Sequence, residues 1–273
     1  MYTGRVLNAL RETEDPAKRR EILDALHRRY CRAGNRRRDP VHFVHGYADP
    51  DDRDVAALVA SSLAYGNIKH ILRSVEDCLG RLSGSPVAFV TECGPRRVRI
   101  ALEGFKHRFC KAEHMAALLT GARRLIREYG SLRACFAAGA APGDETVLPA
   151  LRAFAVQLRH AADDGACEHL VPDPAAGSAC KRLNLLLRWM IRRDAIDPGG
   201  WTAARPSQLI IPLDTHLHRI GRWLGFTRRA SADMTAALEL TAGLRRIDPD
   251  DPIRYDFALT HAAIDSARNR SQG

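Results

Sequence analysis

The sequence predicts an all-α protein, and three features of the chain lead to this class. Apolar residues recur at intervals of three and four along most of the 273 residues, which places them on one face of a helix. Clusters of proline, glycine and aspartate divide these periodic segments from one another. The alternating pattern of a half-buried strand is missing, except in the short run Gln208–Pro212. A chain of this length can fold as one domain or as two closely packed lobes.

Helices of short and medium length are expected in the first half of the chain. A helix that starts near Pro16 places Leu23, Leu26 and Tyr30 on one face. Aspartate is a good N-cap, so Asp49–Asp52 is expected to open the next helix. The further elements expected here are a second helix after Gly66-Asn67, short helices joined by loops over 83–108, a helix over 112–129, a short helix after Gly130-Ser131 and a loop over 137–149.

The second half of the chain shows the most regular helical periodicity. It contains one long segment rich in proline, alanine, glycine and aspartate, residues 163–178, which is expected to be a loop. Helices are expected over 151–162, 178–193, 214–224, 231–244 and 251–266.

The charge of the chain favours a polyanionic partner. Its 42 lysines and arginines exceed its 32 aspartates and glutamates, which gives a formal net charge of +10 at pH 7. Displacing condensed counterions from phosphates is a strong, sequence-independent source of affinity, so nucleic acid is the expected partner. A basic surface that merely keeps the protein in solution is the alternative explanation.

The cysteines and the hydropathy of the chain exclude several other classes. Seven cysteines are scattered without a CxxC pair, so we expect no disulfide framework, no zinc or iron–sulfur site, and no cofactor. No apolar run approaches the length needed to cross a membrane, and Met1–Leu10 lacks the apolar core of a signal peptide. We therefore expect a cytoplasmic protein that does not contact a membrane.

Lys181 stands near the start of the helix expected over 178–193. Five apolar residues of this helix form a core-facing stripe: Leu183, Leu186, Leu187, Met190 and Ile191. Lys181, Arg188 and Arg192 fall on the opposite face. The positive end of the helix dipole and the neighbouring arginines disfavour the ammonium form, and a lysine must lose its proton before it can attack an electrophile. A solvated helix face with one ordinary lysine is the alternative.

Asp214 is expected to cap the helix over 214–224. Pro212 disfavours a helical conformation at Ile211, so the helix can begin just after Asp214. A cap uses one carboxylate oxygen and leaves the other free to face a cleft, although an ordinary N-cap explains the residue equally well. His216 and His218 are two positions apart and point in different directions on a helix, so we expect no metal site there.

These residues lie within a recognisable motif. The string Pro212-Leu-Asp-Thr-His-Leu-His-Arg-Ile-Gly-Arg-Trp-Leu-Gly-Phe226 resembles the V-D-T-H-x-x-R-V-x-x-R-L-G-L segment of the helix-hairpin-helix DNA glycosylase superfamily. Over nearly its whole length the chain also resembles an uncharacterised bacterial family related to that superfamily. The matching segments include Asp49–Arg53, Ser61–Gly66, His107–Phe109, Tyr129–Leu132, Cys180–Asn184, Arg188–Met190, Asp197–Gly199 and Asp251–Phe257.

The resemblance implies a fold and two catalytic residues. The fold would be a two-lobed helical glycosylase fold with a cleft between a central lobe, 50–160, and a lobe formed by 1–49 and 161–273. Bifunctional members pair their Asp with an upstream Lys, and the 33-residue separation of Lys181 and Asp214 is similar to that of the archaeal 8-oxoguanine DNA glycosylases. By this resemblance Lys181 is the nucleophile, and Asp214 supplies the charge and handles protons.

The resemblance also implies residues that bind DNA. Tyr65 or Asn67 takes the place of a polar residue that wedges into the duplex, although either can be an ordinary helix-end residue. Further candidates each have a structural alternative: Trp189, Trp201 and Trp223 as base platforms or core residues, Asp256 as an acceptor for a purine or a helix cap, and Arg188 and Arg192 as phosphate ligands or a solvated face. One segment departs from the superfamily, because Pro172–Ala179 replaces the L-P-G-V-G hairpin that binds a phosphate.

The expected function is therefore base-excision repair. The protein would be a DNA glycosylase and AP lyase that removes a damaged purine, with 8-oxoguanine as the first candidate, from double-stranded DNA and without an obligate protein partner. Two alternatives remain open: a non-catalytic nucleic-acid-binding protein that keeps the fold, and an N-glycosidase that acts on nucleosides or RNA.

Overall fold

The protein is all-α, as predicted. The structure is a computed structural model that describes residues 2–162 and 166–270, so residues 163–165 of the loop expected over 163–178 lie outside it. Its longer helices are α1 (Tyr2–Glu12), α2 (Pro16–Tyr30), α4 (Pro50–Ser62), α5 (Ile68–Arg81), α8 (Ala112–Tyr129), α10 (Leu148–Ala161), α11 (Lys181–Ile191), α12 (Thr215–Trp223), α13 (Met234–Arg245) and α14 (Asp256–Arg270). The shorter elements are η1 (Ala33–Arg38), α3 (Val41–Val44), α6 (Pro86–Glu92), α7 (Gly94–Ala101), β1 (Lys106–His107), β2 (Cys110–Lys111), α9 (Leu132–Ala138), η3 (Pro174–Ala176) and η4 (Pro206–Gln208).

Side-chain caps fix the helix starts that the sequence predicts. Asp49 Oδ1 accepts hydrogen bonds from the backbone N–H groups of Asp51 and Asp52 at the start of α4. Asn67 caps α5 in the same way, and Ser131 caps α9. Each cap satisfies N–H groups that have no partner inside the helix, so the predicted boundaries are confirmed at these positions.

Three local features differ from the sequence prediction. The run Gln208–Pro212 is not a strand: Gln208 ends η4, and the residues after it pair with no strand among the described residues. The N-terminal helix α1 and the short antiparallel hairpin of β1 and β2 were not predicted. Two-residue strands are too short to show an alternating pattern, which explains why the hairpin escapes detection.

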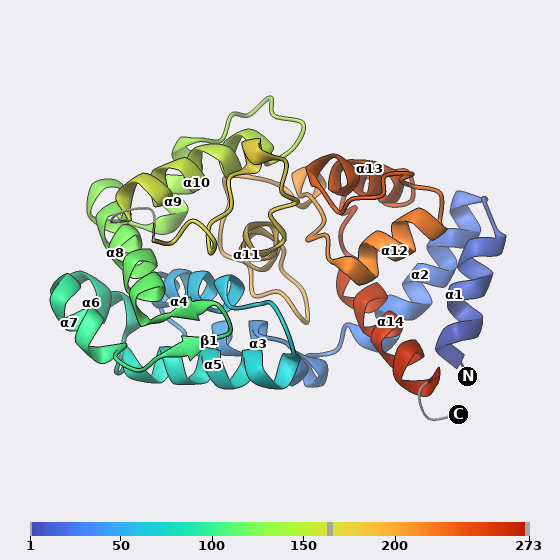
Figure 1. Ribbon diagram of the computed structural model, residues 1–273. Helices are drawn as coiled ribbons and strands as arrows, with labels where there is room; N and C mark the ends of the chain where they lie inside the picture. Colours follow the sequence, from blue (N-terminus) through green and yellow to red (C-terminus); the bar gives the residue numbers. More distant parts are fainter. Residues whose placement is uncertain (1, 163–165, 271–273) are drawn as a thin grey trace.

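The helices form two groups with α11 between them. In Figure 1, α4 to α10 lie on the left, α1, α2, α12, α13 and α14 lie on the right, and α11 is seen nearly end-on in the middle. Helix α11 packs against α4, while α14 packs against α1, α2 and α12. Because all residues from Leu183 to Ile191 are buried, α11 is the central helix of the fold.

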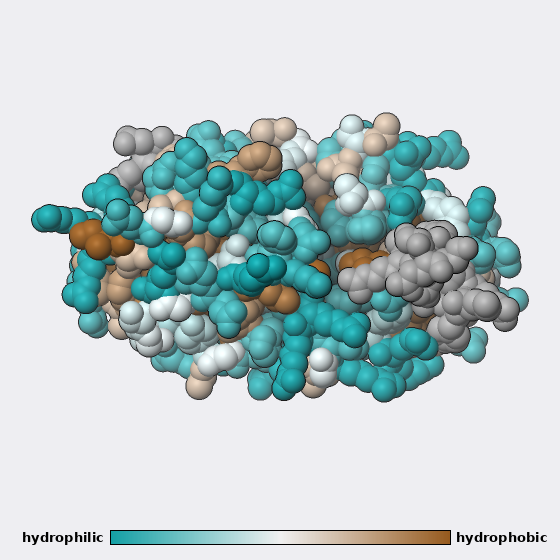
Figure 2. All heavy atoms as spheres, turned by 60° about the horizontal axis from the view of Figure 1, so that its bottom comes forward, coloured by the Kyte–Doolittle hydropathy of each residue, from teal (hydrophilic) through white to brown (hydrophobic). Residues whose placement is uncertain are grey.

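The surface is consistent with this burial of apolar residues. On the face shown in Figure 2, hydrophilic side chains predominate and apolar ones form only small separate patches. None of the helices in residues 2–162 and 166–270 is long and apolar enough to cross a membrane.

The packing of α8 against α10 depends on a glycine. A Cβ atom at Gly121 would lie 2.9 Å from the carbonyl oxygen of Leu158 and 3.1 Å from the backbone nitrogen of Ala162. Because backbone atoms cannot yield easily, we expect Gly121→Ala to lower the free energy of unfolding by about 1–3 kcal/mol, as overpacked cores do. Urea denaturation measures this change.

Gly80→Ala is the matched control. Gly80 lies at an exposed position of α5, and a Cβ atom there would have no other atom within 4 Å. Alanine there removes the entropic cost of a helical glycine and should raise the free energy of unfolding by about 0.5–1 kcal/mol. Equal effects of the two substitutions would contradict the close packing of α8 and α10.

Candidate functional site

Lys181 is the first residue of α11 and faces the turn between α4 and α5. Its Nζ donates a hydrogen bond to the carbonyl oxygen of Ala64 at 3.2 Å. The side chain is half-buried, and its contacts within the described part of the chain include no carboxylate. The preceding residue, Cys180, has a φ of 46°, in the left-handed region, and so turns the chain sharply into the helix. The lysine is therefore held in place by a neutral acceptor, without an ion pair.

The turn that Lys181 contacts carries both predicted wedge candidates. The Tyr65 hydroxyl donates to the carbonyl oxygen of His107 at 3.1 Å, and the guanidinium of Arg182 lies 5.1 Å from the centre of the tyrosine ring. Burial raises the pKa of Tyr65, so its hydroxyl stays protonated and can donate. Asn67 is exposed and caps α5. The tyrosine is thus fixed by its neighbours, whereas Asn67 is accessible beside it.

The hairpin tip next to this turn presents an aromatic residue that the sequence did not single out. Phe109 is 74% exposed, between β1 and β2. The guanidinium of Arg108 lies 5.6 Å from its ring centre, and the Arg108 side chain crosses Gly66 so closely that a Cβ there would be 2.8 Å from it. The sequence does contain a signal, since His107–Phe109 is one of the segments that carry the family resemblance, but only the structure shows that Phe109 faces solvent.

Asp214 is the N-cap of α12, as predicted. One carboxylate oxygen accepts a hydrogen bond from the backbone N–H of Leu217 at 2.8 Å. The side chain is half-buried. Its other oxygen has no hydrogen-bond partner among the described residues, and it is not fully buried. One oxygen of Asp214 thus holds the helix start, and the other is available to a ligand.

Lys181 and Asp214 are not in direct contact. Within residues 2–162 and 166–270, no hydrogen bond or ion pair joins them. On the same helix as Lys181, Arg188 lies two turns later, about 10 Å along the axis, and binds Asp256 at 2.6 Å. Burial raises the pKa of Asp256 against the opposing effect of Arg188, and the nearby charge of Asp214 adds to the rise. The charge of Asp214 thus acts on Asp256, the partner of Arg188.

Arg188 and Arg192 are buried, which corrects the expectation that they contact phosphates. Arg188 pairs with Asp197 and Asp256, and Arg192 pairs with Asp197, Asp194 and Asp251. Burial disfavours a charged arginine, yet these carboxylates outweigh it and raise the pKa of Arg192. The predicted solvent-facing side of α11 is covered by α14 and the loop after α11, so these guanidinium groups are structural.

Three further candidates for the base pocket belong to the interior. Trp189 is fully buried, and Trp201 is 3% exposed, with its indole N–H donating to Asp54 at 2.8 Å. Asp256 is also buried and pairs with Arg188. Among the described residues its carboxylate accepts no helix-capping backbone hydrogen bond, and at this burial a purine cannot reach it. Large aromatic residues beside a core stripe are usually part of the core, and that is the case here.

Trp223 remains partly accessible, with the Arg11 guanidinium 5.6 Å from its ring centre.

The segment Pro172–Ala179, just before α11, is tied to α13. Asp173 caps the short helix η3, and Gly177 has a φ of 82°. The carbonyl oxygen of Gly177 accepts from the N–H of Met234, and Ser178 forms a β-bridge with Asp233. This segment therefore fastens the start of α11 to the other group of helices.

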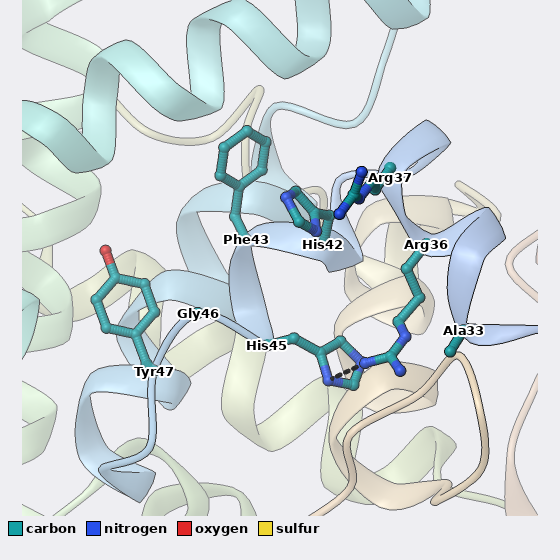
Figure 3. A pocket seen from close by; sticks show the side chains of 8 residues that line it. All are labelled: Ala33, Arg36, Arg37, His42, Phe43, His45, Gly46 and Tyr47. Atoms are coloured by element: carbon teal, nitrogen blue, oxygen red, sulfur yellow. Dashed lines mark hydrogen bonds between the residues drawn. The ribbon is translucent and has the colours of Figure 1, made fainter.

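A basic cavity lies at the far end of α4 from Lys181. It has a volume of about 520 Å³, and Figure 3 shows the side chains that line it: Ala33, Arg36, Arg37, His42, Phe43, His45, Gly46 and Tyr47. His45 donates from Nε2 to the carbonyl oxygen of Ile196, so its Nδ1 accepts from Arg36 at 2.9 Å. Burial lowers the pKa of His45, which keeps this acceptor neutral. The cavity suits an anion but contains neither Lys181 nor Asp214.

Fold and site together define a basic all-α protein in which a half-buried lysine opens the central helix beside an exposed turn and hairpin. A comparison with protein families assigns the chain to one of them. The chain belongs to the DUF2400 family, a family of proteins of unknown function, whose model matches residues 39–265. No curated protein and no solved structure matches the chain.

Proposed function

We propose that the protein is a DNA glycosylase with AP-lyase activity in which Lys181 is the nucleophile and Asp214 its carboxylate partner. One observation carries the proposal: Lys181 Nζ, which pairs with no carboxylate among the described residues, lies 3.2 Å from the backbone of the turn that leads to Tyr65 and Asn67. A lysine that no described carboxylate binds is not held away from a substrate by an ion pair, so its amine can meet an electrophile at this turn.

The chemistry requires both groups. Departure of a base leaves positive charge on the sugar, which a carboxylate such as Asp214 stabilises. The neutral amine of Lys181 forms a bond to C1′ while the C1′–N bond to the base breaks. The base keeps the electron pair of that bond and is then protonated. Loss of the amine proton and ring opening give an imine, and removal of a C2′ proton then expels the 3′ phosphate. A target base must first leave the helical stack.

The surroundings of Lys181 support a duplex as the substrate. The exposed Asn67 and Phe109 lie on adjoining loops, and Arg108 and Arg182 add positive charge there. Aromatic side chains enter gaps between bases, and cations bind the phosphates alongside. The damaged purine, with 8-oxoguanine as the first candidate, remains the proposed substrate by resemblance.

A non-catalytic nucleic-acid-binding protein is the second candidate, and the burial of Trp189 and Trp201 favours it. With these rings in the core, fewer aromatic groups are available to hold an extruded base than the resemblance implies. This protein would bind DNA in a salt-dependent way without forming a covalent intermediate.

Covalent trapping distinguishes the candidates. The protein is incubated with a panel of duplexes, each with one damaged base, in the presence of borohydride, which reduces an imine to a stable amine. A cross-link to one or a few duplexes is the expected result. Binding without any cross-link would support the second candidate, and turnover of mononucleosides or RNA alone would indicate an N-glycosidase with another substrate.

A further inference from the structure

Three potential metal ligands meet beside the start of α11. They are the thiol of Cys110 in β2, the imidazole of His114 in the first turn of α8, and the imidazole of His169 in the segment before η3. One ligand atom from each lies within 4.8 Å of the other two. Cys110 is buried and both histidines are half-buried, so the three groups are shielded but not sealed from solvent. From this geometry we infer a zinc site formed by Cys110, His114 and His169.

The local fold explains why these residues converge. β2 runs directly into α8, so Cys110 and His114 are four residues apart across the strand–helix junction. His169 comes from a distant segment, and its ring packs edge-on against His114 with the ring centres 4.4 Å apart. The backbone carbonyl of His169 accepts a hydrogen bond from Arg182 of α11, which fixes this segment in place.

The ligand types select the metal. One thiolate and two imidazoles are the ligands that Zn²⁺ prefers, and three protein ligands leave its fourth position open to water. The protein atoms must move closer together on binding, because zinc holds sulfur and nitrogen ligands at roughly 2.0–2.3 Å. Both histidine side chains are at least partly accessible to solvent, so small ring rotations need not displace the core.

Binding releases protons and exchanges one hydrogen bond. Burial raises the pKa of Cys110 to about 12, so the thiol is protonated without metal, and the Cys110 proton leaves for solvent as the zinc–sulfur bond forms. His114 Nδ1 accepts from the N–H of Lys111 at 3.1 Å, which places its ring proton on Nε2. Coordination by His114 therefore requires that its ring rotates or that this hydrogen bond is lost. The energy of the hydrogen bond is smaller than the energy of a metal–imidazole bond.

The charged residues near the proposed zinc site influence which fourth ligand the metal would bind. Arg182 is close enough to Cys110 to favour its thiolate, and Glu113, which pairs with Lys111, has the opposite effect. A zinc ion with one thiolate still carries positive charge, and Arg182 adds to it. The fourth position stays open to water, and the net positive charge also suits an anion there. The site does not depend on the proposed glycosylase activity.

Metal binding by the full chain tests the inference. We expect one Zn²⁺ per chain after equilibration and dialysis, and with Co²⁺ a thiolate-to-metal charge-transfer absorption together with the visible bands of a four-coordinate ion. Cys110→Ser should abolish the charge-transfer absorption, and His169→Gln should weaken zinc binding by more than the roughly 10–100-fold typical of losing a group that only supports a ligand.

Matched controls come from neighbours outside the cluster. Cys167→Ser changes a buried cysteine two residues from His169, and His160→Gln changes an exposed histidine. Both should bind metal like the unchanged protein. Circular dichroism of every metal-free variant identifies any that fails to fold, and His169→Gln, at a partly exposed position, provides a second test if Cys110→Ser does. Less than one metal per chain, no thiolate absorption, or equal loss in Cys167→Ser would overturn the inference.

Discussion

Lys181→Ala is expected to abolish covalent trapping and strand scission, by roughly 10³-fold or more, while the protein still binds duplex DNA. The reason is chemical, because a nucleophile that forms the intermediate has no substitute when it is removed. Within the part of the chain that the structure describes, the Lys181 side chain makes a single hydrogen bond, to Ala64, so its loss should alter the fold little. Gel analysis of borohydride-treated reactions measures the covalent complex, and fluorescence anisotropy measures binding.

Two other lysine variants separate nucleophilicity from charge. Lys181→Arg keeps the positive charge but cannot form an imine, so it should be as inactive as Lys181→Ala and bind DNA as well as the unchanged protein. Lys69→Ala removes an exposed lysine of α5 close to Asn67 and should leave trapping intact. If Lys181→Ala traps normally while Lys69→Ala does not, the nucleophile has been assigned to the wrong residue.

Arg188→Met is expected to cause the largest loss of stability, about 3–5 kcal/mol in the free energy of unfolding. The substitution leaves Asp197 and Asp256 buried, at 0% and 5% side-chain exposure, without one of their guanidinium partners. An uncompensated buried charge is costly, whereas the intact pair need not be strongly stabilising by itself. Chemical denaturation followed by circular dichroism measures the change.

An exposed ion pair provides the comparison. Arg229 and Asp233 are joined at 2.6 Å in the connection that leads into α13, with side-chain exposures of 44% and 21%. Arg229→Met should cost about 0–1 kcal/mol, because water and salt screen such a pair. Adding Asp256→Leu to Arg188→Met should recover part of the lost stability. No recovery would show that packing around the arginine, and not the unpaired carboxylate, causes the loss.

Local rules predict much of this fold from the sequence. The caps Asp49, Asn67 and Asp214 begin helices where expected, because capping depends on residues within one turn. The helix predicted over 112–129 has the same bounds as α8. These features need no knowledge of what lies elsewhere in the chain.

The environment of α11 shows where such rules stop. Its periodicity gives a stripe of leucines and an opposite face with Arg188 and Arg192, and charged residues on a helix normally face water. Here that face meets carboxylates from residues 194–197, 251 and 256, which are close only after folding. Long-range pairing of this kind leaves no periodic signal, and the same holds for His169 beside Cys110.

The β-bridge of Ser178 with Asp233 and the Arg188–Asp256 pair attach both ends of α11 to the right-hand helices of Figure 1. With one attachment near each end, α11 resists rotation relative to these helices. A large partner that touches both halves thus meets a surface whose shape is already set. Any adjustment needed for a close fit must then come from the partner.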